Sequence, residues 1–136
     1  MDLGFAGAAT VVVGGGRGMG LATAQCLADD GARVAIVGHS RDVLDAAAAD
    51  LARRGSPDAV AIVADTGDDA AVRQVFADLG ERWGDELNAL INTVGPGAAG
   101  NFEELTDQQW RDAFDGGLMG MVRCVRAALP LLRKAE

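Results

Sequence analysis

The amino-acid sequence predicts a single α/β domain in which a parallel sheet is flanked by helices. Two observations carry this prediction: short apolar runs alternate with helical patterns four times, and a glycine-rich turn follows the first run. A length of 136 residues fits one domain, residues 1–136, with a core of its own. The composition, 49% hydrophobic and 24% charged, is typical of a folded globular protein.

Four apolar runs are the expected strands, at residues 10–13, 33–37, 59–64 and 87–93. A helical pattern follows each of the first three runs. The first two predicted helices cover residues 19–29, which end before Gly31, and residues 41–54. The third is indicated by apolar residues at steps of three and four, namely Val72, Val75, Phe76, Leu79 and Trp83.

A longer helix, residues 106–129, is expected after a loop that reads GPGAAGN. Thr106 and Gln109 form a capping box at its start. Its apolar face is supplied by Trp110, Phe114, Leu118, Met121, Val122, Val125 and Leu129. Its three glycines are expected to mark close backbone packing, at Gly116, Gly117 and Gly120. Pro130 is expected to kink or end this helix.

The charge balance excludes several classes of partner. The net charge is −8 and the pI is about 4.5, so neither nucleic acid nor an anionic membrane is an expected partner. Glycines interrupt the apolar N-terminal run before it could span a bilayer, which favours a cytoplasmic protein. His39 is the only histidine, so no metal site is predicted. Cys26 and Cys124 are expected to be reduced core residues.

The glycine-rich turn reads GGGRGMG over residues 14–20, between the first expected strand and helix. Glycine allows a positive φ and a close approach of the backbone to a ligand, and the N–H groups at a helix start favour a phosphate. The turn therefore predicts a dinucleotide site, with the glycines serving only a tight turn as the alternative. Its predicted cofactor-binding residues are Gly14, Gly16, Arg17, Gly18, Met19 and Gly20.

The spacing of these glycines is GxxxGxG, at Gly14, Gly18 and Gly20, and it fits neither GxGxxG nor a P-loop. It resembles the first turn of the short-chain dehydrogenase/reductase family, TGxxxGxG, whose members bind NAD or NADP. Val13 stands where that family has threonine. The resemblance implies the N-terminal, cofactor-binding half of a Rossmann-type fold, with strands in the order 3-2-1-4 and the fourth at an edge.

The resemblance extends over nearly the whole chain. Asp65, followed by Thr66, matches the family aspartate that hydrogen-bonds the adenine. Asn92, Thr93, Val94 and Gly95 look like the family's NNAG motif with the second and third positions altered. As alternatives, Asp65 serves only to cap the next helix and Asn92 only ties neighbouring loops together. Because both positions lie at the carboxyl ends of strands that are successive in the sequence, where ligands of open α/β sheets bind, the binding role is favoured.

The end of the second strand indicates which dinucleotide is bound. An acidic residue there would suit the ribose of NAD, whereas this strand runs into His39, Ser40 and Arg41. Together with Arg17, these residues are expected to surround the 2′-phosphate of NADP. NAD stays open as the alternative, with Ser40 or Asp42 capping the next helix and Arg41 solvated.

The catalytic residues that the resemblance implies are a serine, a tyrosine, a lysine and an asparagine on the long helix. The sequence has no tyrosine, its only lysine is Lys134, and its only serines are Ser40 and Ser56. Gly117 falls where the family has the asparagine. No catalytic residue is therefore predicted in this chain, and the fifth strand that carries the family serine would follow Glu136.

Three hypotheses remain open at this point. The chain is part of an NADP-dependent oxidoreductase whose other half lies outside these 136 residues, or a non-catalytic nucleotide-binding module, or a folded remnant that binds nothing. The first is favoured, with the isolated chain inactive in hydride transfer. Strand 87–93 and helix 106–129 are expected to bind a second copy of the chain or a complementary chain, because an edge strand and an apolar helix face need a partner.

Overall fold

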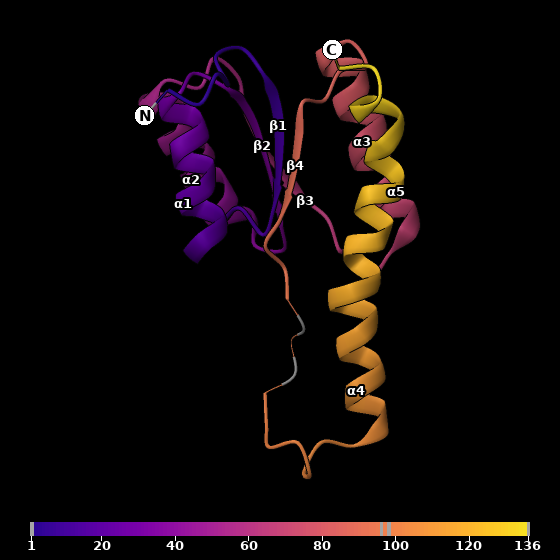
Figure 1. The fold of residues 1–136 in the computed structure, drawn as a ribbon. Coiled ribbons are helices and arrows are strands. Elements are labelled where there is room, and N and C mark those ends of the chain that lie inside the picture. Colours follow the sequence, from indigo (N-terminus) through magenta and orange to yellow (C-terminus); the bar gives the residue numbers. More distant parts are fainter. Residues whose placement is uncertain (1, 96, 98, 136) are drawn as a thin grey trace.

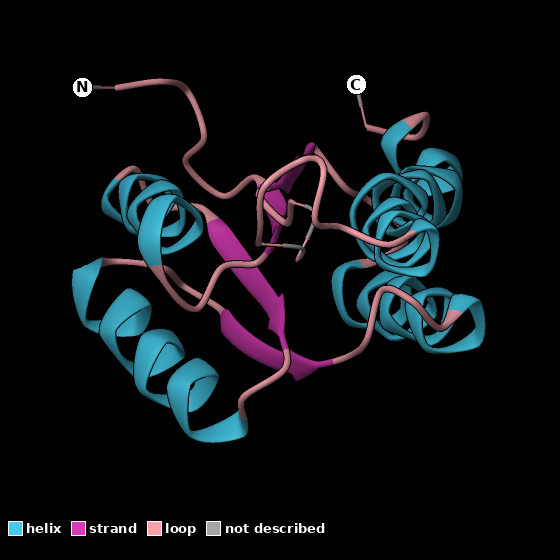
Figure 2. Ribbon diagram, turned by 90° about the horizontal axis from the view of Figure 1, so that it is seen from below, coloured by secondary structure: helices cyan, strands magenta, loops and turns pink. Residues whose placement is uncertain are grey.

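The computed structural model describes residues 2–95, 97 and 99–135; Met1, Glu136 and two residues of the GPGAAGN loop, Pro96 and Ala98, lie outside it. Within the described part, four parallel strands pair in the order β3-β2-β1-β4, which confirms the predicted sheet. The strands are β1 (Ala9–Val13), β2 (Arg33–Gly38), β3 (Ala59–Val63) and β4 (Ala89–Asn92). Figure 1 shows helices on both faces of this sheet, and Figure 2 shows the same three layers from below.

The two faces of the sheet are covered by different pairs of helices. On one face, α1 (Gly18–Asp29) and α2 (Arg41–Arg54) pack over a cluster that includes Val12, Val34 and Ile36. On the other, α3 (Asp69–Trp83) and α5 (Gly120–Leu132) pack over Val11 and Val13. Because successive side chains of a strand point to opposite faces, a strand covered on both faces must be apolar throughout, as the run Thr10–Val13 nearly is.

The ends of the helices follow the signals in the sequence. Gly31 follows α1 with φ +80°, a left-handed conformation that lets its N–H reach Ala28 and end the helix. Asp68 begins α3, and its carboxylate accepts hydrogen bonds from the backbone N–H groups of Ala70 and Ala71. The helix boundaries are therefore set by local chemistry at both ends.

The fourth strand is shorter than the predicted residues 87–93. The ladder between β1 and β4 begins at the pair Thr10 and Ala89 and ends at Val13 and Asn92. Its length is limited by β1, because the chain turns away at Gly14. Among the described residues β4 pairs only with β1, so it is an edge strand, as predicted.

The predicted helix 106–129 is a longer rod with a break in its hydrogen bonding. It consists of α4 (Asp107–Ala113), the π-helical segment η1 (Phe114–Met119) and α5, and it extends well beyond the end of the sheet (Figure 1). The predicted capping box at Thr106 and Gln109 is confirmed. Pro130 lies in the last turn of α5, which ends two residues later at Leu132. The helix accommodates it there because a proline near a helix end interrupts few hydrogen bonds.

The glycines of this rod are explained only in part by close packing. A Cβ at Gly120 would lie 2.7 Å from the Thr66 hydroxyl, which confirms the prediction there. A Cβ at Gly116 would meet nothing within 4 Å, so the prediction is wrong at that position. Gly116 lies instead in η1, where two adjacent glycines weaken the regular helix.

The cysteines differ in their surroundings. Cys124 is buried between α5 and the sheet, as predicted, whereas Cys26 is exposed, so its placement in the core was wrong. The exposed position arises because the buried residues of α1 are its small Gly20, Ala24 and Ala28 together with Leu27. In the part of the chain that the structure describes, no helix is long and apolar enough to cross a membrane. The same residues contain no cluster of His, Cys, Asp and Glu suited to a metal ion.

Candidate nucleotide-binding site

The predicted site residues gather at the carboxyl-terminal edge of the sheet, the lower edge in Figure 1. The glycine turn leaves β1 there, and the loops after β2, β3 and β4 begin beside it. In a parallel sheet all strands end on the same side, so residues that are distant in the sequence meet at this edge. Asn92, the last residue of β4, pairs with Val13 beside the turn, and Thr93 follows it in contact with Gly14 and Gly20.

Backbone geometry requires glycine at several positions of the turn. Gly14 has φ +83° and Gly18 has φ +53°, a region that L-residues rarely adopt. A Cβ at Gly20 would lie 2.1 Å from the Gly14 carbonyl oxygen, so only glycine fits there. Gly18 differs from the others, because nothing lies within 4 Å of its missing Cβ. Packing thus explains Gly14 and Gly20, and Gly18 leaves the open side of the turn without a side chain.

The backbone N–H groups of the turn are available to a ligand. Among the described residues, the N–H groups from Gly15 to Gly20 donate to no acceptor. They lie at the start of α1, whose first turn carries no acidic residue. A helix start with unsatisfied N–H groups carries a partial positive charge that favours an anion. The turn therefore fits a pyrophosphate, in both its hydrogen-bond donors and its open side.

A hollow joins the glycine turn to the end of β2. It is lined by Gly14, Gly16, Arg17, Gly38, His39, Ser40, Val43 and Leu44. The structure thus brings together three of the four residues predicted to surround a 2′-phosphate. Ser40 precedes α2 but its side chain accepts no capping hydrogen bond, so the alternative in which it only caps the helix is wrong. Val43 and Leu44 were not predicted as part of the site.

Arg41 lies differently from the other residues of this corner. Its guanidinium pairs with Asp45 at 3.2 Å and donates to the carbonyl oxygen of Ala61 at 3.3 Å. Asp45 is one helical turn further along α2, where an i, i+4 pair of opposite charges meets. Arg41 is therefore an exposed, ion-paired residue that does not line the hollow. Arg17 is the guanidinium that lines it.

The residues after β3 connect the site to the opposite helix layer. Asp65 is exposed, and its carboxylate accepts a hydrogen bond from the Gly67 N–H at 2.8 Å. Asp68 caps α3, so the alternative that gave Asp65 this role is wrong. Thr66 is buried against Gly120 of α5, and its carbonyl oxygen accepts a hydrogen bond from Arg123 at 3.1 Å.

Arg123 is a functional candidate that sequence reasoning missed. Its half-buried side chain bonds Thr66 and also the carbonyl and carboxylate of Asp115, at 3.1 and 2.6 Å. Residues eight positions apart on a regular α-helix lie two turns apart and do not pair side by side. The π-helical segment between them changes this spacing. The sequence carried no signal from which this contact could have been found.

The residues after β4 divide into two groups. The side chain of Asn92, which is half-buried at the end of the strand, makes no hydrogen bond among the described residues, and Gly95 is exposed. Thr93 donates both its N–H and its hydroxyl to the carbonyl oxygen of Val13, each at 2.9 Å. The tie between neighbouring segments, suggested as an alternative for Asn92, is therefore made by Thr93.

Ser56, Lys134 and Gly117 contribute no catalytic side chain to this edge. Ser56 is buried and donates its hydroxyl to the Ala32 carbonyl, and Lys134 pairs with Asp85 at 3.4 Å. Gly117, at the position of the expected asparagine, is buried and has no side chain. Among its described residues, the site offers phosphate-binding groups and a carboxylate but no tyrosine or lysine.

Comparison with known proteins places this geometry in context. The sequence model of a family described as short chain dehydrogenase matches residues 8–136. The chain is 31% identical over 126 residues to meso-2,3-butanediol dehydrogenase of Serratia marcescens, covering 93% of this chain and 49% of that protein. It thus spans about half the length of the curated relatives it matches.

Solved structures with a similar fold are also dehydrogenases and reductases of about twice this length. The chain superposes on L-sorbose reductase of Gluconobacter frateurii, complexed with NADPH and L-sorbose, with a TM-score of 0.89 and 28% identity, covering 98% of this chain and 50% of that one. It superposes on a short chain dehydrogenase of Burkholderia cenocepacia in complex with NADP with a TM-score of 0.86 and 33% identity, covering 94% and 52%. The chain therefore has the fold of proteins that have been solved with NADP or NADPH.

Proposed function

Because this chain belongs to the short chain dehydrogenase family of oxidoreductases, we propose that it is the cofactor-binding half of an NADP(H)-dependent enzyme. The whole enzyme would reduce carbonyls or oxidise alcohols by hydride transfer, with NADPH supplying the hydride when it is bound. The observation that carries the proposal is that the glycine turn and the hollow beside it, both suited to an anion, adjoin each other. The N–H groups of the glycine turn and the hollow at Arg17, His39 and Ser40 share the same lining.

Different groups of this chain bind different parts of the dinucleotide. The N–H groups of residues 15–20 bind the pyrophosphate, because the helix start favours negative charge. Arg17, His39 and Ser40 hold the 2′-phosphate through hydrogen bonds that are stronger where the donor is charged. The Arg41 guanidinium would contact this phosphate only after leaving its ion pair with Asp45. No acidic residue lines this hollow, which favours NADP over NAD.

The remaining predicted contacts lie after β3 and β4. Asp65 keeps one carboxylate oxygen without a hydrogen bond among the described residues, and this oxygen is proposed to accept from the adenine amino group. Thr66 shapes the same loop through its contact with α5. Asn92, Thr93 and Gly95 are proposed to border the cofactor on the side of β4.

A titration with the two cofactors tests this assignment. We expect NADPH to bind more tightly than NADH, as measured by enhancement of the dihydronicotinamide fluorescence. Arg17→Ala should weaken NADPH binding by about tenfold or more, the worth of one charged hydrogen bond, and leave NADH binding within about twofold. Arg53→Ala, an exposed arginine of α2 outside the hollow, is the matched control. Equal affinities for both cofactors in the unchanged chain would refute the assignment to NADP.

We propose that residues 1–136 alone do not catalyse hydride transfer, because they contain no tyrosine and their lysine lies away from the site. Steady-state NADPH oxidation with a panel of carbonyl compounds tests this. No turnover above the uncatalysed rate is expected. Sustained NADPH oxidation by the pure chain would contradict this proposal. Binding of NADPH without turnover would fit a non-catalytic NAD(P)-binding module equally well.

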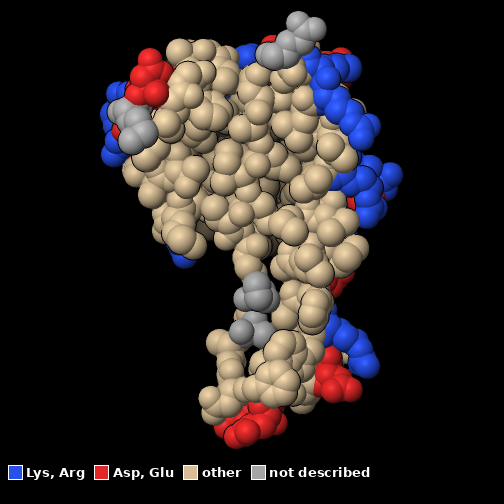
Figure 3. Space-filling view, in the orientation of Figure 1, with Lys and Arg blue, Asp and Glu red and all other residues tan. Residues whose placement is uncertain are grey.

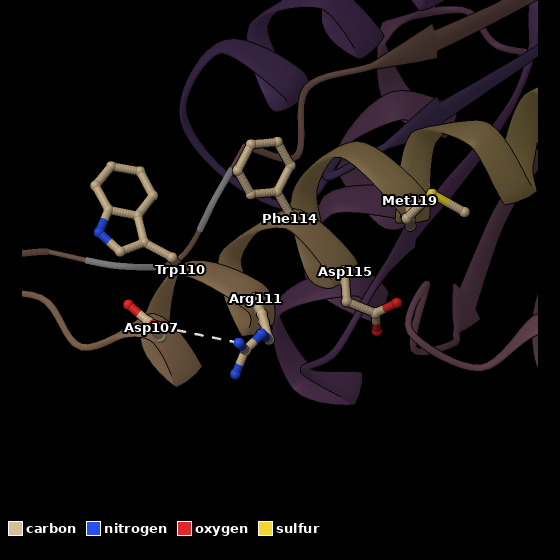
Figure 4. A pocket seen from close by; sticks show the side chains of 6 residues that line it. All are labelled: Asp107, Trp110, Arg111, Phe114, Asp115 and Met119. Carbon is tan, nitrogen blue, oxygen red and sulfur yellow. Dashed lines mark ion pairs between the residues drawn. The ribbon is translucent and has the colours of Figure 1, made fainter.

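A partner is proposed for the surface that β4 and the long rod leave exposed. Large apolar side chains follow one side of the rod and are between 36% and 57% exposed: Trp110, Phe114, Leu118, Met121, Val125 and Leu129. Figure 4 shows Trp110 and Phe114 on one side of α4, with the ion pair of Asp107 and Arg111 on the other. In Figure 3 the charged side chains gather at the margins of this face, and its middle, over β4, is uncharged.

Such a surface is covered in a stable protein, because exposed apolar patches and edge strands promote association. The proposed partner is a second copy of this chain or a complementary chain that supplies the other half. Light scattering at micromolar concentration should give the mass of a dimer or larger. Leu118→Glu should shift the mass toward the monomer. A monomeric unchanged chain would exclude self-association and leave a complementary chain as the partner to be sought.

A further inference from the structure

We propose that Thr93 is a positioning residue, whose hydroxyl holds the glycine turn at the distance from β4 at which its N–H groups can receive a pyrophosphate. The sequence placed Thr93 among the cofactor-binding residues. The structure points its hydroxyl at the backbone of β1 instead. The inference rests on the proposed binding of a dinucleotide for its effect on affinity, but the position of the turn can be measured without any ligand.

The carbonyl oxygen of Val13 accepts two hydrogen bonds from the same residue. The N–H and the hydroxyl of Thr93 both lie 2.9 Å from it. Val13 is the last residue of β1, and the turn begins at the next residue. A carbonyl oxygen held twice cannot tilt freely, so the direction in which the chain enters the turn is fixed at this point.

The same hydroxyl is enclosed by the two ends of the turn. A Cβ at Gly14 would lie 2.6 Å from it, and a Cβ at Gly20 would also lie 2.6 Å from it. Gly14 begins the turn and Gly20 lies in the first turn of α1. The Thr93 side chain thus fills the space between them, beneath the N–H groups that face the ligand. A group of another size or polarity at this position must move one end of the turn relative to the other.

Two of the positions at which this chain departs from the family's motifs, Val13 and Thr93, are in direct contact. Position 13 lacks the threonine of TGxxxGxG, and position 93 has threonine in place of the second asparagine of NNAG. The hydroxyl that is absent from the end of β1 is thus supplied from the end of β4. The two departures therefore belong together, as parts of one connection between β1 and β4.

A matched control lies at the other end of β1. The buried hydroxyl of Thr10 donates to the Arg33 carbonyl oxygen at 2.9 Å, a hydrogen bond of the same kind and length between neighbouring strands. Thr10 lies far from the turn, near the start of its strand. Valine has nearly the shape of threonine but cannot donate, and its methyl group cannot approach a carbonyl oxygen to 2.9 Å. Thr93→Val and Thr10→Val therefore remove equivalent bonds at different distances from the turn.

The first experiment compares NADPH affinity with stability in the full chain, using fluorescence titration and urea unfolding. We expect Thr93→Val to bind NADPH about tenfold more weakly than the unchanged chain, and Thr10→Val to bind it within about twofold. Both variants should lose a similar amount of stability, measured as the urea concentration at the midpoint of unfolding. Thr93→Ser, which restores the hydroxyl, should recover the affinity. Equal affinities of the two valine variants, or no recovery with serine, would overturn the inference.

The second experiment needs no nucleotide. Amide hydrogen exchange of Gly14 and Leu21, whose N–H groups at the two ends of the turn donate to the Val37 and Arg17 carbonyl oxygens, should be faster in Thr93→Val than in Thr10→Val, because the turn loses its support. If NADPH does not bind the unchanged chain while this exchange difference is present, the proposed function fails and the positioning role of Thr93 stands. If the exchange rates of the two variants agree in these residues, the positioning role fails whatever the affinities show.

Discussion

The β1-α1-β2-α2 part and the α4–η1 segment, which is the first part of the rod, are stabilised in different ways. In the first part Leu44 and Leu51 are 1% and 0% exposed, and the two helices are joined by hydrogen bonds from Gln25 to Asp50 and from Arg54 to Asp29. In the rod Phe114 is 57% exposed. Phe102, in the preceding loop, is 81% exposed although its ring packs edge to face on Trp110.

This difference shows which part of the chain is complete by itself. The glycine turn and the hollow belong to a region with a buried apolar core of its own, although Met19 in the turn is exposed. The α4–η1 segment is held by local hydrogen bonds, such as the capping box at Thr106, and by the bond from Arg123 to Asp115. Cofactor binding is therefore a property expected of the isolated chain, whereas the conformation of the rod depends on what covers it.

The largest effect is expected from adding one methyl group to the glycine turn. Gly20→Ala places a Cβ 2.1 Å from a backbone oxygen, and should abolish NADPH binding and lower the free energy of unfolding by about 3 kcal/mol or more. Gly116→Ala, in the rod, meets nothing within 4 Å and should be neutral or stabilising by up to about 1 kcal/mol. Urea unfolding and NADPH titration measure both; a stable, binding Gly20→Ala would show that the turn can rearrange.

A smaller contrast is expected from leucines of the two regions. Leu51→Ala removes a side chain that is 0% exposed and should cost about 3 kcal/mol of unfolding free energy. Leu118→Ala, whose leucine is 48% exposed, should cost less than about 0.5 kcal/mol at concentrations where the chain is monomeric. Urea unfolding over a range of protein concentrations distinguishes the two. A large loss for Leu118→Ala in the monomer would mean that the rod packs on this chain itself.

The smallest effect is expected from an ion pair and depends on pH. Asp58 accepts two hydrogen bonds from Arg82, each 2.7 Å long, and one from the Trp83 indole. The bonds from Arg82, against the cost of partial burial, hold the pKa of Asp58 below its ordinary value. A carboxyl with a lowered folded pKa stabilises the fold above its unfolded pKa, and this contribution is lost as the pH falls through the folded pKa.

Asp58→Asn should therefore cost about 1 kcal/mol near neutral pH, and the difference from the unchanged chain should shrink as the pH falls below about 4. Asp107→Asn is the control in the rod, because its pair with Arg111 is 3.9 Å long and highly exposed, so it should have little effect at any pH. Urea unfolding at several pH values measures both. A difference for Asp58→Asn that grows in acid would contradict the direction of the shift.

Most of the fold could be read from the sequence because its signals are local. The strands, the end of α1 at Gly31 and the capping box at Thr106 depend on residues within a few positions of one another. The hollow beside the glycine turn could be anticipated at His39 and Ser40, since residues at the ends of neighbouring parallel strands must meet. The exposure of Cys26 could not be anticipated, because the side of α1 that packs on the sheet is formed by Gly20, Ala24 and Ala28 together with Leu27.

The sequence by itself determined the order of the elements and the glycine turn, because backbone geometry and periodicity are properties of short segments. Only the tertiary structure decided where side chains at the site point. Arg41 donates to the carbonyl oxygen of Ala61, Arg123 bonds Asp115 across a π-helical turn, and Thr93 bonds Val13 at the start of the glycine turn. Each of these directions depends on which neighbour offers the nearest charge, carbonyl oxygen or space, and those neighbours are brought together by folding.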